Sequence, residues 1–279
     1  MYQTVQFVKI NPAENTTVFV LDPIAKDSHQ SVARELMAYG NVSAEQVGFV
    51  TLQPSEDCDG RIDMMGGEFC GNASRSLGAY LAYRNGQESL EKIYRISCSG
   101  IPSVMECQVK KTAVPNRFIA KIEMPLPRQI RQVSIAVAKH LYQFQRVDFE
   151  GITHFVLPVA ENELMDRPAL FEAVKNHMGQ DGYEALGVMF YDLVAKNMVA
   201  AVYVKATDSL FWERSCGSGT AAVGAVLGTL YGTSVKVPVR QVGGIITTIV
   251  IMEDQVMRHI QIDGEIEITA EGLAHIDTK

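Results

Sequence analysis

The sequence of 279 residues has no block of basic residues and no excess of positive charge. Lysine and arginine total 25 against 32 aspartates and glutamates, which gives a formal net charge of −7. A protein that binds nucleic acid through its phosphates needs a basic face, so this class of partner is excluded. The mild acidity is most simply a solubility feature.

Long apolar runs are also missing. A membrane-spanning helix needs roughly 20 consecutive apolar residues, and the nearest candidate, residues 219–231, is short and contains glycine. The first residues lack the basic segment followed by an apolar run that is typical of a signal peptide. We therefore expect no membrane contact and a cytoplasmic location.

Cysteine is sparse, and the spacing of the cysteines matches no known metal or redox motif. The odd count of five, without a secretory signal, argues against a disulfide framework, and no Cys or His cluster has zinc-site spacing. No glycine-rich nucleotide loop is present either. We expect neither a metal nor another cofactor. The five cysteines are Cys58, Cys70, Cys98, Cys107 and Cys216.

What the chain does contain is many short runs rich in valine, isoleucine and phenylalanine, which predict strands. Helical periodicity predicts helices at 30–39 and from 71 to about 85 in the first half, and at 132–143, 164–178 and 219–231 in the second. The expected strands are 3–10, 16–22, 46–53, 60–65, 93–98, 103–110, 117–124, 151–158, 186–192, 198–206, 209–213, 235–239, 245–252, 257–263 and 265–270.

Two prolines within residues 124–127 interrupt this pattern and predict a domain boundary. The expected domains are 1–126, to which residues 265–279 return, and 127–264. Both halves show strands, a helix that follows a cysteine, and more strands. We therefore predict an α+β fold of two pseudo-symmetric domains, each a mostly antiparallel sheet or barrel wrapped around a central helix. The helix at 219–231 has no polar face, so it should be buried.

Two segments repeat one pattern, in which a cysteine and a glycine directly precede a helix. Residues 70–72 read Cys-Gly-Asn, and residues 216–218 read Cys-Gly-Ser. A helix start lowers the pKa of a thiol, and its free N–H groups bind anions such as a carboxylate. One thiolate and one thiol facing a common carboxylate suit proton transfer at the α-carbon of an amino acid. The pattern predicts a cofactor-independent racemase with Cys70 and Cys216 as acid and base.

Several segments across nearly the whole chain resemble one known group. In chain order they are Asn11-Pro12 with Asn15, Glu45-Gln46-Val47-Gly48-Phe49, Gly67-Glu68-Phe69-Cys70-Gly71-Asn72-Ala73, Trp212-Glu213, Ser215-Cys216-Gly217-Ser218-Gly219-Thr220 and Gly243-Gly244-Ile245. Together they resemble the cofactor-independent, two-cysteine racemases and epimerases of the diaminopimelate epimerase fold. Within that group the chain is most similar to histidine racemases of staphylopine-type metallophore biosynthesis.

The resemblance implies a set of site residues. Cys70 would act on the L form of the substrate and Cys216 on the D form. The remaining implied contacts are Gly71, Asn72, Gly217 and Ser218 around the α-carboxylate, and Asn15, Gln46 and Glu213 near the α-carbon.

Departures from the group bear on the substrate. Diaminopimelate epimerases carry polar residues, mostly Asn, for the distal charged groups, whereas the matching positions here are Met64, Ile152 or Thr153, and Gly187. A pocket with so few polar partners favours a shorter side chain such as imidazole, for which Glu45 is a candidate partner.

Alternatives stay open at this point. One alternative is a diaminopimelate epimerase or a proline-type epimerase that uses the same thiol chemistry. Another is an amino-acid-binding protein whose site has lost its activity. The default for His154 is a satisfied structural histidine, and Met65 and Met189 are expected to fill the core. The expected partner is an amino-acid substrate, and a homodimer is left open.

Overall fold

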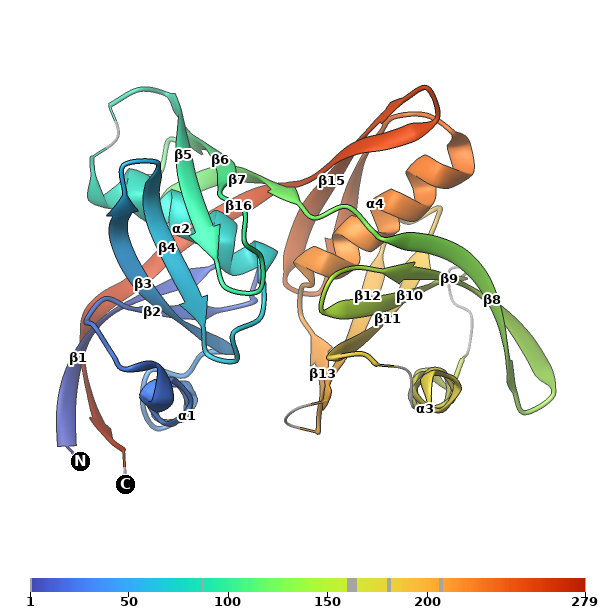
Figure 1. Cartoon of the computed structure of the whole chain (residues 1–279), viewed down its shortest axis with the longest axis horizontal. Coiled ribbons are helices and arrows are strands. Elements are labelled where there is room, and N and C mark those ends of the chain that lie inside the picture. The colour runs from blue at the N-terminus through green and yellow to red at the C-terminus, as the bar shows by residue number, and fades with distance from the viewer. Residues whose placement is uncertain (1, 87, 160–164, 180–181, 206–207, 279) are drawn as a thin grey trace. The chain divides into compact units, whose positions relative to one another are not determined.

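Strands make up most of the chain in the computed structural model, which describes residues 2–86, 88–159, 165–179, 182–205 and 208–278 (Figure 1). The chain divides into two units. Unit 1 comprises Met1–Glu123 and Asp263–Lys279, and unit 2 comprises Met124–Ile262. None of the described helices is long and apolar enough to cross a membrane.

Unit 1 is built from a sheet that closes on itself. Its strands follow the chain order from β1 to β7, and β16 pairs with both β7 and β1. The β2–β3 and β4–β5 pairs are parallel and most others are antiparallel. The bounds are β1 (Tyr2–Asn11), β2 (Thr17–Val20), β3 (Gln46–Ser55), β4 (Cys58–Met64), β5 (Glu91–Cys98), β6 (Met105–Lys111), β7 (Arg117–Met124) and β16 (Val256–Asp277).

Helix α2 (Gly71–Arg84) lies inside this sheet and packs against β4, β5 and β6 (Figure 1). The helix approaches β6 closely, since a Cβ on Gly78 would lie 2.4 Å from Cys107 Sγ. Burial extends almost all round α2 and includes its polar residues Ser74, Arg75 and Ser76. Helix α1 (His29–Met37), after the short turn η1 (Lys26–Ser28), packs its apolar side on β3.

Unit 2 contains a six-stranded sheet and a hairpin on either side of a second buried helix. The sheet order is β13-β12-β11-β10-β9-β8, in which only β10 and β11 are parallel. Helix α4 (Gly217–Tyr231) packs against this sheet and against β15, and α3 (Arg167–Met178) packs on β8 and β11. The strands are β8 (Gln129–Val137), β9 (His140–Asp148), β10 (Ile152–Val159), β11 (Ala185–Asp192), β12 (Met198–Val204), β13 (Ser209–Glu213), β14 (Val235–Gln241) and β15 (Gly244–Glu253).

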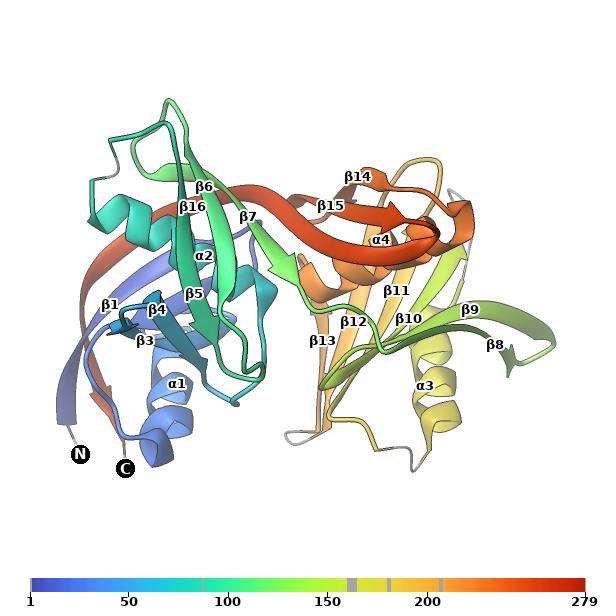
Figure 2. The same ribbon diagram turned by 45° about the horizontal axis from the view of Figure 1, so that its top comes forward.

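The predicted α+β class, the mostly antiparallel pairing and the buried helix after Cys216 are confirmed. The helix predicted at 132–143 is wrong, because these residues form the β8–β9 hairpin (Figure 2). Val133 and Ile135 alternate with exposed residues, and Ala138 makes the turn with φ at 53°. The expected ends at 164 and 206 lie outside the described residues.

The two strands expected at 257–263 and 265–270 are one strand, β16, which continues to Asp277. Its buried residues Ile260, Ile262, Ile266 and Ile268 keep one two-residue phase, which Gly264 does not interrupt. The first part of β16 belongs to unit 2 and the second part to unit 1.

Candidate active site

The loop before α2 is held in place by the end of β5. Ser99 Oγ accepts a hydrogen bond from the Met64 backbone N–H at 2.9 Å and donates one to the Glu68 carbonyl at 2.7 Å. Gly100 follows with φ at +78°, and a Cβ there would lie 2.3 Å from the Phe69 nitrogen. Only glycine permits this approach, so residues 99–100 determine where the chain enters α2.

Cys70 stands at the N-cap of α2, as the sequence predicted. Its backbone is extended, with φ −130° and ψ 110°, and its sulfur accepts the Ala73 N–H at 3.4 Å. Gln46 Nε2, from the start of β3, donates to the same sulfur at 3.4 Å. The side chain is half-buried.

A network of amide groups surrounds this thiol. Asn15 Oδ1 accepts hydrogen bonds from Gln46 Nε2 and from Asn72 Nδ2, both at 3.0 Å. Asn15 Nδ2 donates to Glu45 Oε2 at 2.8 Å. The structure therefore brings together all the side chains of unit 1 that the sequence singled out, although Asn15, Gln46 and Asn72 come from three separate segments.

Cys216 repeats this geometry at the start of α4. Its φ and ψ are −124° and 112°, and its sulfur accepts the Gly219 N–H at 3.2 Å. Ser218 Oγ lies 3.6 Å from the same sulfur. Gln241, which the sequence did not single out, accepts the Cys216 N–H at 2.7 Å and donates to Thr220 Oγ1 at 3.0 Å.

His154 lies beneath this second helix start. Its ring is fully buried, and Nε2 is 3.0 Å from Ser218 Oγ, while Nδ1 has no hydrogen-bond partner among the described residues. Gly187 makes room for the ring, because a Cβ there would lie 2.1 Å from Nδ1. The expectation of a satisfied structural histidine is met at Nε2, which contacts a residue of the predicted site, and not at Nδ1.

Burial determines the electrostatics of both thiols. It raises the pKa of Cys70 to about 12, although the Ala73 N–H and Gln46 act in the opposite direction. Burial also raises the pKa of Cys216 well above its usual value, and Glu213, which contacts the thiol, raises it further. The prediction that a helix start lowers these pKa values is wrong here, because desolvation outweighs the N–H donors. Burial likewise lowers the pKa of His154 to about 3, so its imidazole is neutral.

Other predicted positions have structural surroundings. Met64 and Met189 are buried, and the Met189 sulfur fills the space beside Gly219. Thr153 donates to Asp148 Oδ1 at 2.8 Å. Among the described residues, no group of three or more His, Cys, Asp or Glu has the geometry of a metal site.

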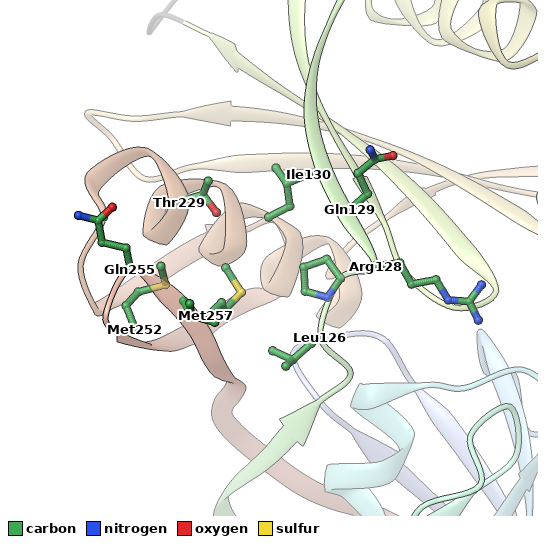
Figure 3. A pocket seen from close by; sticks show the side chains of 11 residues that line it. Leu126, Arg128, Gln129, Ile130, Thr229, Met252, Gln255 and Met257 are labelled. Atoms are coloured by element: carbon green, nitrogen blue, oxygen red, sulfur yellow. The ribbon is translucent and has the colours of Figure 1, made fainter.

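A pocket of about 520 Å³ in unit 2 is separate from these residues (Figure 3). It lies beside the C-terminal end of α4, between Thr229, Met252 and Met257 on one side and Arg128 on the other. Cys216, Ser218 and His154 do not line it.

Comparisons with known proteins agree with one another. A family profile described as the histidine racemase CntK N-terminal domain matches residues 4–275. The chain is 36% identical over 275 residues to a histidine racemase of Fusobacterium nucleatum, covering 98% of each chain. It is 28% identical over 280 residues to a histidine racemase of Staphylococcus aureus, covering 99% of each.

Solved structures show the same fold at low sequence identity. A hydroxyproline epimerase from Agrobacterium vitis with bound trans-4-hydroxy-L-proline matches with a TM-score of 0.67 and 12% identity, covering 98% of this chain and 93% of the other. A predicted epimerase from Pseudomonas aeruginosa matches with a TM-score of 0.63 and 12% identity, covering 96% and 98%.

Proposed function

The chain belongs to the histidine racemase CntK family, and on this basis we propose that it interconverts L- and D-histidine by proton transfer at the α-carbon. The observation that carries the mechanism is the pair of equivalent cysteine N-caps. Cys70 and Cys216 share their backbone conformation within a few degrees, and each sulfur accepts the N–H of the third residue after it.

In the proposed reaction one cysteine is a thiolate and the other a thiol. The Cys70 thiolate takes the α-proton of L-histidine, and the Cys216 thiol gives its proton to the opposite face, which forms D-histidine. Each turnover leaves the two protonation states exchanged, and the reverse reaction starts from that state. No pyridoxal phosphate or metal takes part in this proposal.

The raised thiol pKa values make each thiolate a strong base, but they also make the thiolate rare at neutral pH. A thiolate of pKa near 12 is a strong base, as removal of a weakly acidic α-proton requires. At pH 8, however, such a thiol is ionised in only about one molecule in ten thousand. The positive ammonium group of the substrate, placed within a few ångströms, would lower this pKa and so raise the thiolate fraction.

We further propose how the substrate is held. Backbone N–H groups at the two helix starts, at Gly71 and Asn72 and at Gly217 and Ser218, would bind the α-carboxylate. The Glu45 carboxylate, which accepts a hydrogen bond from Asn15, would also accept one from the imidazole ring.

The test is racemisation in deuterated water. L-histidine should gain deuterium at the α-carbon while its optical rotation decays to zero. Cys70→Ser and Cys216→Ser should each lose at least about 1,000-fold in kcat, since a hydroxyl is a far weaker acid than a thiol. Cys58→Ser is the matched control, because the Cys58 thiol hydrogen bonds to the Gly60 carbonyl and to Ser97 Oγ, and a hydroxyl preserves these contacts.

Full turnover in either cysteine variant would refute the two-base mechanism. A panel of L-amino acids followed by chiral chromatography tests the substrate, and a marked preference for proline or diaminopimelate over histidine would refute that assignment. Binding of histidine without deuterium exchange would indicate an amino-acid-binding protein instead.

Three expectations stay predictions beside this one. Fractionation of cells would test the cytoplasmic location, light scattering would test for a homodimer, and loss of metallophore production on deletion would test the pathway.

A further inference from the structure

Arg75 is the largest side chain that is completely withdrawn from solvent. It lies one turn into α2, five residues after Cys70. Arginine is almost never fully buried unless it has partners. Its Nε and Nη2 both donate to Asn72 Oδ1 at 3.1 Å, while Nη1 has no hydrogen-bond partner among the described residues. This cation is therefore directed at a single amide oxygen.

The guanidinium remains charged at neutral pH. Burial lowers the pKa of Arg75 to about 10, and Asp263, from the unit 1 part of β16, opposes this effect. Negative charge on Cys70 also raises the pKa of Arg75, so the two groups interact electrostatically. Because the coupling is mutual, the cation favours the thiolate form of Cys70, although burial and the Ala73 N–H act more strongly on the pKa of this thiol.

The contacts of Arg75 determine which way three amide groups point. An amide has a donor end and an acceptor end, and the guanidinium only donates. Asn72 must therefore turn Oδ1 toward Arg75, which leaves its Nδ2 to donate to Asn15 Oδ1. Asn15 then donates through Nδ2 to the Glu45 carboxylate, which only accepts when ionised. The Arg75 cation and the Glu45 anion thus lie at the two ends of this series of hydrogen bonds. Both favour the same orientation of the amide groups between them.

The orientation of the Gln46 amide depends on Asn15. Because Asn15 presents its oxygen, Gln46 presents Nε2, which also lies 3.4 Å from Cys70 Sγ. Thr17 Oγ1, which donates its own proton to the Asn15 carbonyl, accepts from the same nitrogen at 2.8 Å and favours the same orientation. If the amides reversed, Gln46 would present an oxygen to the sulfur, which would favour the protonated thiol. Reversal would also place the Asn72 NH2 group against a buried guanidinium, with donors facing donors.

We propose that Arg75 is a positioning residue for the reaction described above, whose buried guanidinium orients Asn72, Asn15 and Gln46 so that an N–H group faces the Cys70 sulfur. The inference rests on the proposed function for its catalytic meaning and on the hydrogen-bond geometry for the orientation. It also connects the base with Glu45, the proposed anchor of the substrate ring.

The experiment measures Cys70 directly. Wild-type protein and Arg75→Met are alkylated with iodoacetamide from pH 6 to 9, where Arg75 is charged, and modified peptides containing Cys70 and Cys216 are quantified by mass spectrometry. Loss of the cation should slow alkylation of Cys70 at a given pH by about tenfold, which corresponds to a pKa rise of about one unit. Cys216, at the start of α4, is the internal control and should not change.

Other groups facing this region are the same in both proteins. Cys98 and Glu68 face Cys70, and Cys107 and Asp263 face Arg75. Thermal unfolding shows whether Arg75→Met is folded, and if it is not, the neutral Arg75→Gln is measured in its place. Arg75→Lys keeps a cationic donor and should restore Cys70 alkylation and kcat to within about threefold of wild type.

An unchanged Cys70 profile in a folded neutral variant overturns the proposal. A loss in Arg75→Lys as large as in Arg75→Met also overturns it, because packing alone would then explain the effect. Alkylation does not depend on turnover. If wild-type protein fails to racemise histidine while Cys70 responds as expected, the proposed function fails and the orientation by Arg75 stands.

Discussion

Gly187→Ala should damage unit 2 through a single methyl group. The added Cβ would lie 2.1 Å from His154 Nδ1, 2.6 Å from Cε1 of the same ring and 2.9 Å from the Met189 methyl. The first of these distances is more than 1 Å short of ordinary contact, and the ring is fully buried. Overpacking and the weakened hydrogen bond to Ser218 together should cost about 3 kcal/mol of unfolding free energy.

Urea unfolding followed by circular dichroism measures this cost. The matched control is Gly40→Ala, whose added Cβ has no atom within 4 Å, so its stability should change by only about 0.5 kcal/mol. In the absence of urea, at a temperature where Gly187→Ala is folded, kcat should still fall at least about tenfold. The reason is that Ser218 loses the partner that orients its hydroxyl toward Cys216. A midpoint equal to wild type would refute the packing argument, and normal kcat in a destabilised variant would refute the link from His154 to Cys216.

Three further predictions concern the loop, the substrate anchor and alkaline pH. Gly100→Ala should lower kcat with little effect on KM, because its Cβ would meet the Phe69 nitrogen and displace Cys70; unchanged kinetics would contradict this. Glu45→Gln should raise KM for histidine about tenfold, as expected for loss of a charged hydrogen bond, and an unchanged KM would remove Glu45 from the site. Burial raises the pKa of Cys107 to about 12, whereas the thiol of the unfolded chain ionises near pH 9. The stabilisation by the protonated thiol is therefore complete below about pH 9. Between about pH 9 and 12 the free energy of unfolding falls by about 1.4 kcal/mol per pH unit. Urea unfolding from pH 8 to 11 should therefore show a steeper loss for wild type than for Cys107→Ala, and equal slopes would count against a buried protonated thiol.

Local sequence was sufficient to predict the two helix starts. The Cys-Gly pairs stand before runs of small and apolar residues, and in both helices a glycine eight residues after the cysteine packs against a strand. These features depend on neighbours in the chain. The hairpin of β8 and β9 was also readable, because Val133 and Ile135 alternate with exposed residues, but the run of apolar residues near the Ala138 turn resembles a helical pattern over 132–143.

The electrostatics and the supporting residues depend on tertiary structure instead. A helix start predicts a lowered thiol pKa, yet burial, which depends on how many atoms surround the sulfur, reverses the direction at both cysteines. Gln241 reaches Cys216 from the end of β14, and no local pattern marks it. Arg75 did carry a signal, since a charged residue in the middle of a helix rich in small and apolar residues is either a mistake in the assignment or a buried ion with a partner.

Cys70 and Cys216 occupy equivalent N-cap positions, but different side chains surround the two thiols. A racemisation that uses two unlike bases makes a kinetic prediction about the substrate. Amides between Arg75 and Glu45 surround Cys70, whereas His154 and Ser218 support Cys216. L- and D-histidine are mirror images, so their equilibrium constant is one, and kcat/KM must be equal in the two directions at every pH and in every variant. Substitution of Arg75 can therefore change kcat and KM unequally between directions, but kcat/KM must stay equal in the two directions, and only alkylation can locate the affected thiol. Hydroxyproline or diaminopimelate gives diastereomers, for which the ratio is free to depart from one. Progress curves started from either enantiomer should converge on zero rotation with equal kcat/KM; rotation that fails to decay from either enantiomer would refute racemisation of histidine.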